Sequence, residues 1–112
     1  MATTLAYAIK FVADMDQAVQ FHVEQLDLKL RFQSPEWSEF DTGATTLALH
    51  IASAESPAGT CQIGLGVSDI QGFYAKAMNS GVLFTSPLTD IHGQRIAKLR
   101  DIDGALCSVS GP

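Results

Sequence analysis

The feature that most constrains the fold of this chain is an internal repeat. Residues 9–18 (IKFVADMDQA) line up with residues 64–73 (GLGVSDIQGF), and in both segments an apolar run ends in Val-x-Asp before a helical pattern begins. The offset is 55 residues, nearly half of the 112-residue chain. Because the same order of predicted elements follows both junctions, we expect two similar halves.

In the first half, residues 5–12 read as a strand, and Asp14 is placed to cap a helix, with Gln17 three residues later as in a capping box. Apolar residues then recur at helical spacing, and His22 is expected to be a partly exposed residue of this helix. Lys10 falls on the helix side of the first strand. Three further strands are predicted over residues 28–33, 37–41 and 45–51.

The second half repeats this pattern. Residues 61–67 predict a strand, and Ser68 or Asp69 caps a helix that runs to about residue 79 and is ended by Gly81. Strands are predicted over residues 82–85, 94–99 and 105–110, with Asp103-Gly104 as a hairpin signal. Each half is therefore βαβββ, and the linker 53–59 separates them.

The predicted fold class is α+β, with two tandem βαβββ modules, 1–52 and 60–112, in one domain over residues 1–112. A half of this size buries little apolar surface alone, so the halves are expected to pack together, with curled mixed sheets around a cavity.

Composition excludes several classes of protein. With 46% apolar residues and 17% charged residues, the chain is not disordered. Its net charge of −5 argues against binding to the phosphate backbone of a nucleic acid. No apolar run is long enough to span a membrane. The N-terminus lacks the basic region of a signal peptide, and Cys61 and Cys107 lack metal or redox spacing, so we expect a cytoplasmic protein with buried free thiols.

Several motifs together resemble the vicinal oxygen chelate superfamily, which includes glyoxalase I, bleomycin-resistance proteins and extradiol dioxygenases. The resemblance covers essentially the whole chain and rests on the paired Val-x-Asp junctions and on four further segments: Phe21 with Leu26-Asp27-Leu28, Asp41-Thr42-Gly43, Leu47-Ala48-Leu49-His50 and Asp101-Ile102-Asp103-Gly104. It implies the fold predicted above.

In metal-dependent members of that superfamily, four side chains hold a divalent ion. Carried over onto this sequence, the resemblance implies the positions Tyr7, His50, Gln62 and Ser108, with Ser108 where an acidic ligand is expected. Neutral Tyr and Ser are poor ligands for a divalent cation, and this set contains no carboxylate. We therefore expect no metal cofactor, with His50 and Gln62 as weak metal candidates.

Strand alternation indicates which residues line the cavity. Thr46, Ala48 and His50 share one face, opposite Leu47, Leu49 and Ile51, and Gln62, Gly64 and Gly66 share a face opposite Ile63, Leu65 and Val67. Trp37 is a candidate stacking surface for a planar ligand, although core packing or a dimer contact explains it equally well.

Three functions remain open. The first is a small-molecule-binding protein that sequesters or carries an aromatic or heterocyclic ligand through Tyr7, Trp37, His50, Gln62 and Ser108. The alternatives are a metal-dependent lyase or dioxygenase and a metal-free enzyme in which His50 is the general base. The resemblance also implies a homodimer.

Overall fold

The computed structural model describes residues 2–91 and 93–112, which form eight strands and two helices in two compact units. The first unit is Tyr7–Cys61, and the second unit combines the residues up to Ala6 with Gln62–Pro112. The strand β1 (Thr4–Val12) contributes residues to both. Neither helix in the described part of the chain is long and apolar enough to cross a membrane.

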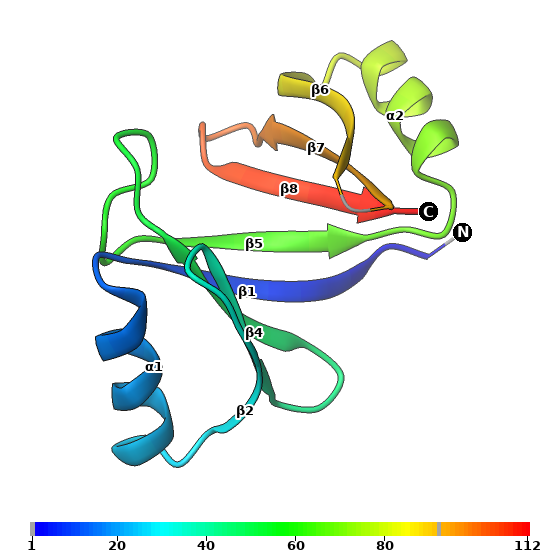
Figure 1. Cartoon of the computed structure of the whole chain (residues 1–112). Coiled ribbons are helices and arrows are strands. Elements are labelled where there is room, and N and C mark those ends of the chain that lie inside the picture. The colour runs from blue at the N-terminus through cyan, green and yellow to red at the C-terminus, as the bar shows by residue number, and fades with distance from the viewer. Residues whose placement is uncertain (1, 92) are drawn as a thin grey trace. The chain divides into compact units, whose positions relative to one another are not determined.

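The first unit is a mixed sheet with one helix (Figure 1). Its strands are β2 (Lys29–Gln33), β3 (Trp37–Asp41) and β4 (Thr46–Ile51), in the order β2-β3-β4-β1. The strands β1 and β4 are parallel, whereas β3 is antiparallel to both of its neighbours. The helix α1 (Met15–Glu24) begins after Asp14, whose carboxylate accepts a hydrogen bond from the Gln17 amide at 3.0 Å.

The second unit repeats this arrangement, with α2 (Ile70–Asn79) as its helix. Its strands are β5 (Cys61–Gly66), β6 (Leu83–Ile91), β7 (Gln94–Arg100) and β8 (Leu106–Gly111), in the order β5-β8-β7-β6. Asp69 caps α2, and Gly81 follows the helix with a φ of +93°. The predicted α+β class with two βαβββ modules is confirmed.

Each unit has a core between its helix and its sheet. In the first unit, Met15 and Val19 of α1 pack on Phe40 and Leu49. In the second, Ile70 of α2 packs with Val67, Ala97 and Val109. The other face of each sheet therefore points away from the helix, as alternation along a strand requires.

Three sequence predictions were wrong in detail. Cys107 is a buried free thiol as expected, but Cys61, the first residue of β5, is exposed. The strand predicted over residues 82–85 extends to Ile91, because β6 is an edge strand that tolerates Pro87. Its register with β7 shifts between Phe84 and Ser86 and again between Ser86 and Thr89, the interval that contains Pro87. His22 is buried, at 3% exposure, rather than partly exposed. Its ring stacks on Phe40 with centroids 5.4 Å apart.

Candidate functional site

The predicted site residues of the first unit lie on the sheet face opposite α1. The register pairs Tyr7 with Thr46 and Phe11 with His50, and it pairs Trp37 of β3 with His50. The alternate residues of β4, Leu47 and Leu49, pack against the α1 core, as predicted. We call this side of the sheet the aromatic face; it is formed by Tyr7, Ile9, Phe11, Trp37, Glu39, Thr46, Ala48 and His50. Within it, Ile9, Phe11 and Ala48 are a buried cluster against which Tyr7 and Trp37 pack.

Trp37 brings two other predicted residues together on this face. Its ring centroid lies 5.6 Å from that of Tyr7 and 6.0 Å from that of His50, with interplanar angles of 74° and 81°. The Phe11 ring extends the cluster, 5.5 Å from the His50 ring. These edge-to-face distances are those of favourable aromatic pairs.

The indole is held in place by polar contacts at both ends of the residue. Ser34 Oγ donates to the Trp37 carbonyl at 2.6 Å and accepts from the Trp37 amide at 3.0 Å. The indole Nε1 donates to Glu39 Oε2 at 2.8 Å. Trp37 is therefore fixed before any ligand arrives, which lowers the entropic cost of binding.

Glu39 and Arg31 are part of the site and were missed by sequence reasoning. An Arg31 guanidinium nitrogen donates to Glu39 Oε1 at 2.9 Å and to Thr46 Oγ1 at 2.7 Å. Glu39 lies two residues after Trp37, so strand alternation alone could have found it. Arg31 was hidden by a β-bulge between Leu30 and Phe32, which changes the face that the following residues of β2 occupy.

The environment of Tyr7 keeps its phenol protonated. Burial raises the pKa of Tyr7 above its ordinary value of 10.0, the Glu39 carboxylate raises it further, and Arg31 acts in the opposite direction. Near neutral pH, Tyr7 therefore presents a hydroxyl that can donate a hydrogen bond rather than a phenolate.

This shift predicts a change of stability at high pH. Because the folded protein holds the Tyr7 proton more tightly than the unfolded chain does, the contribution is fully present below about pH 10 and is lost as the pH rises through the raised pKa. Ultraviolet titration of a Tyr74→Phe variant, which leaves Tyr7 as the one tyrosine, should give a midpoint above 10.0. Adding Glu39→Gln should lower that midpoint, and an unchanged midpoint would contradict the role of Glu39.

His50 has one ring nitrogen committed to the backbone. Its Nδ1 lies 2.7 Å from the Ile51 carbonyl oxygen. A carbonyl only accepts hydrogen bonds, so Nδ1 carries the proton in the neutral ring and Nε2 carries the lone pair. His50 can therefore accept a hydrogen bond from a ligand through Nε2.

The remaining predicted residues lie in the second unit. Gln62 is on β5 and is 8% exposed, and Ser108 is on β8, where it pairs with Gly64 of β5. Both occupy the face opposite α2, since Leu65 and Val109 on the alternate positions pack with the α2 core. The predicted alternation along β5 is confirmed for these residues.

The four carried-over positions do not fit a divalent metal ion. Tyr7 pairs with Thr46, whereas His50 pairs with Phe11 four positions further along, which corresponds to about 13 Å of strand. Tyr7 remains a protonated phenol, and Gln62 and Ser108 supply only neutral oxygens. Within residues 2–91 and 93–112, no three His, Cys, Asp or Glu side chains form a group that could hold a metal.

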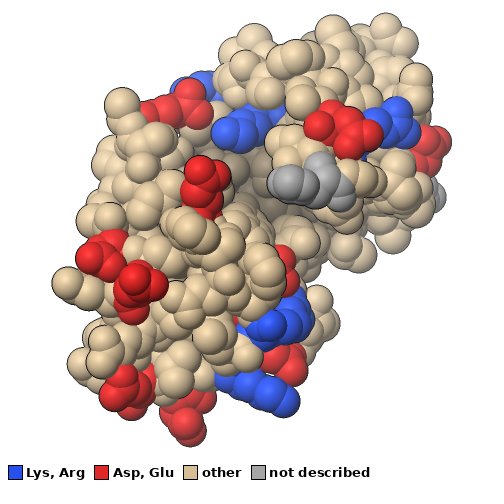
Figure 2. Space-filling view, viewed as in Figure 1, with Lys and Arg blue, Asp and Glu red and all other residues tan. Residues whose placement is uncertain are grey.

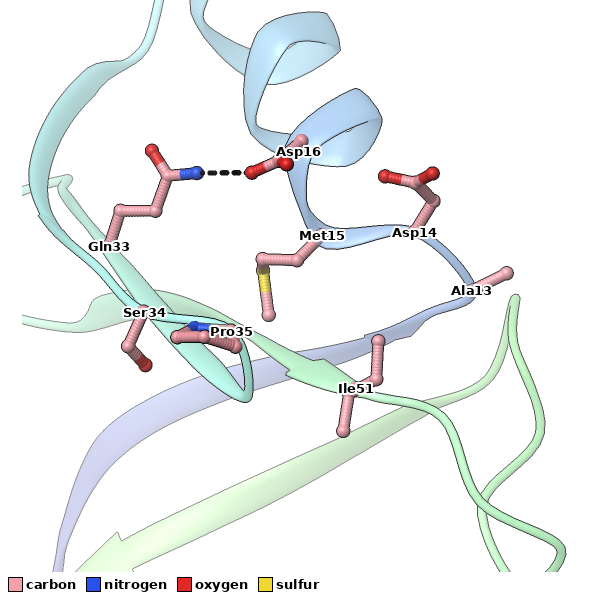
Figure 3. A pocket seen from close by; sticks show the side chains of 8 residues that line it. All are labelled: Ala13, Asp14, Met15, Asp16, Gln33, Ser34, Pro35 and Ile51. Carbon is pink, nitrogen blue, oxygen red and sulfur yellow. Dashed lines mark hydrogen bonds between the residues drawn. The ribbon is translucent and has the colours of Figure 1, made fainter.

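A pocket of about 440 Å³ lies on the α1 side of the first unit, away from the aromatic face (Figure 3). Its carboxylates are already engaged, because Asp14 caps α1 and Asp16 accepts from the Gln33 amide at 2.9 Å. It contains none of the predicted site residues. The lining residues are Ala13, Asp14, Met15, Asp16, Gln33, Ser34, Pro35 and Ile51.

Comparison with solved structures supports the fold. A hypothetical protein of Bacillus halodurans has a TM-score of 0.82 at 20% identity, covering 100% of this chain and 96% of that one. Methylmalonyl-CoA epimerase from Mycobacterium tuberculosis has a TM-score of 0.76 at 18% identity, covering 96% and 87%. A glyoxalase/bleomycin resistance protein/dioxygenase superfamily member from Vibrio splendidus has a TM-score of 0.73 at 14% identity, covering 99% and 100%.

No functionally curated protein matches the chain. A family model, in contrast, matches residues 4–109, which is nearly the whole sequence, and its description agrees with the resemblance seen in the motifs. The chain therefore belongs to the glyoxalase/bleomycin resistance protein/dioxygenase superfamily.

Proposed function

We propose that this protein binds a small aromatic or heterocyclic molecule on the aromatic face and sequesters or carries it without a metal cofactor. The observation that carries the proposal is the fixed Trp37 indole, which Glu39 holds at 2.8 Å and which lies edge to face with Tyr7 and His50. The predicted homodimer and cytoplasmic location remain parts of this proposal.

The chemistry of the face suits a planar ligand with a polar edge. A flat aromatic ligand gains binding free energy from stacking and edge contacts with aromatic side chains. These side chains have few rotamers, so ordering them on binding costs little entropy. The Tyr7 hydroxyl offers a donor and His50 Nε2 offers an acceptor, so a ligand with both kinds of group would be oriented as well as held. Gln62 and Ser108 remain predicted ligand contacts from the resemblance.

The same contacts favour the role of a carrier rather than that of an enzyme. The Glu39 carboxylate is bonded to Arg31 and to the indole, and the Tyr7 phenol is held protonated, so neither is a free base. His50 is the remaining candidate for a general base on this face. The proposal assigns it a hydrogen bond to the ligand.

The test is a binding screen that uses Trp37, the single tryptophan, as the reporter. A panel of indole, quinoline and naphthalene derivatives should include compounds that quench its emission in a saturable way. By calorimetry, Trp37→Ala should weaken such a compound about 10- to 100-fold, through loss of a stacking surface. Phe21→Leu, a change at an exposed aromatic on α1, is the matched control and should leave affinity unchanged.

Two outcomes would overturn the proposal. One is equal affinity for the Trp37→Ala and Phe21→Leu proteins, which would place the ligand elsewhere. The other is conversion of a bound compound to product that His50→Ala abolishes, which would make His50 a catalytic base. Recovery of the compound unchanged supports a carrier.

A further inference from the structure

The charge of the chain is divided unevenly between its two units. The first unit contains eight acidic and three basic residues, which accounts for the whole net charge of −5. Acidic side chains gather over α1 and its neighbouring strands in Figure 2. The second unit contains four acidic and four basic residues. Any cationic cluster in such a chain must therefore be sought in the second unit.

Two of these cations share the sheet face opposite α2. On β7, Ala97 and Leu99 pack into the α2 core, so Lys98 and Arg100 point to the other face. Their partners on β8 are Ser108 and Leu106, respectively. Arg95, by contrast, lies on the α2 side and donates to Gln71 of that helix at 3.0 Å.

No described carboxylate forms an ion pair with Lys98 or Arg100; the ion pair in the described chain is between Arg31 and Glu39. The acidic residues of the second unit have other positions. Asp69 caps α2, and Asp101 accepts from the amides of its own turn. Asp90 is in register with Arg95 on the α2 side. Asp103 lies exposed in the turn between β7 and β8, and neither Lys98 nor Arg100 is in an ion pair within the described residues.

Neutral hydrogen-bonding groups lie beside these cations. Ser108 is flanked by Lys98 on β7 and by Gly64 on β5. Gln62 shares the Gly64 face and is 8% exposed, and neither polar atom of its side chain is both fully buried and without a partner. The Gln62 side chain is therefore a neutral donor beside Ser108 on this face.

We infer that this cationic face, formed by Gln62, Gly64, Lys98, Arg100 and Ser108, binds a small oxyanion, the carboxylate or phosphate group of a metabolite or free inorganic phosphate. Lys98 supplies a point charge, and Arg100 supplies planar donors, one of which is already used at 2.7 Å on the Gly104 carbonyl. Ser108 Oγ and the Gln62 amide supply neutral donors. Gln62 and Ser108 are also predicted contacts of the aromatic ligand, so Lys98 and Arg100 are the residues that distinguish the oxyanion site from the aromatic face.

The experiment is a titration of the isotope-labelled protein with inorganic phosphate and, separately, with acetate, at constant ionic strength and pH 7. Amide resonances of Gly64, Lys98 and Ser108 should move in a saturable way. Lys98→Met and Arg100→Met should each weaken binding about tenfold or more, because each removes a charge-assisted hydrogen bond. Lys76→Met, which removes a cation on α2, is the matched control and should bind as the parent does.

Two further variants keep the test decisive if Arg100→Met disturbs the turn at Gly104. Arg100→Lys keeps the positive charge but lacks the planar pair of guanidinium donors, and it should give an intermediate affinity for the anion. Ser108→Asp places a carboxylate between the donors and should abolish binding. Saturable binding by phosphate but not acetate identifies a phosphate site, and the reverse identifies a carboxylate site.

The inference is overturned if neither anion binds saturably, or if Lys76→Met weakens binding as much as Lys98→Met does. Trp37→Ala separates the two proposals, since it should abolish stacking of the aromatic probe and leave the phosphate titration unchanged.

Discussion

Replacing His22 with Ala should lower the free energy of unfolding by about 3 kcal/mol, which corresponds to a fall of roughly 10 °C in Tm. The ring is 3% exposed and stacks on Phe40, which is fully buried. Truncation therefore leaves a cavity beside the core of the first unit. It also removes the two hydrogen bonds that the imidazole makes with Lys10 and with the Ala18 carbonyl.

These two hydrogen bonds fix the tautomer of the His22 imidazole. The Ala18 carbonyl lies 2.7 Å from Nδ1, so Nδ1 donates, and Nε2 must then accept from the Lys10 ammonium at 2.9 Å. Removal of the ring leaves this ammonium partly buried without its acceptor. The expected loss therefore exceeds that of a cavity alone.

A double-mutant cycle isolates the Lys10 contribution. Lys10→Met alone should cost less than His22→Ala, and in the His22→Ala background it should recover about 1–2 kcal/mol, because no charge is then left unpartnered. Chemical denaturation of the four proteins measures both terms. Strict additivity of the two changes would show that the contact between Lys10 and His22 contributes nothing.

The Lys10–His22 contact also marks a limit of sequence interpretation. Alternation placed Lys10 on the helix side of β1, where a cation looked out of place, and helical spacing placed His22 in α1. Each residue was assigned to the right element, but nothing in the sequence paired them. The pairing depends on how α1 crosses the sheet, which periodicity does not specify.

Most of the fold was predictable, because local signals and the repeat agreed. The Val-x-Asp junctions became the capped starts of both helices, with Asp14 and Asp69 as caps. The candidate site was predictable only in part. Alternation gave the face that holds His50, whereas the β-bulge in β2 concealed Arg31. Glu39 was not predicted as a site residue, because nothing in the sequence shows that its carboxylate accepts a hydrogen bond from the Trp37 indole.

Gly111→Ala should destabilise the protein by about 2–3 kcal/mol, the second largest effect expected here. A β-carbon at position 111 would collide with the Val67 carbonyl oxygen and would lie 3.3 Å from the β-carbon of Ile70. Ile70 is fully buried, and the Val67 amide is bonded to the Ser110 carbonyl at 3.0 Å. Relief of the clash therefore requires the end of β8 to move away from the start of α2.

Neighbouring and more exposed positions provide the controls for Gly111→Ala. Ser110→Ala changes the adjacent residue of β8 without adding volume and should stay within about 0.5 kcal/mol of the parent. Gly59→Ala meets no atom within 4 Å, but it forces a φ of +90° on a residue with a side chain, and it should cost about 1 kcal/mol. Thermal and chemical unfolding of the three variants should therefore rank Gly111→Ala as the most damaging. A Gly111→Ala protein as stable as the Ser110→Ala protein would show that β8 and α2 do not pack this closely.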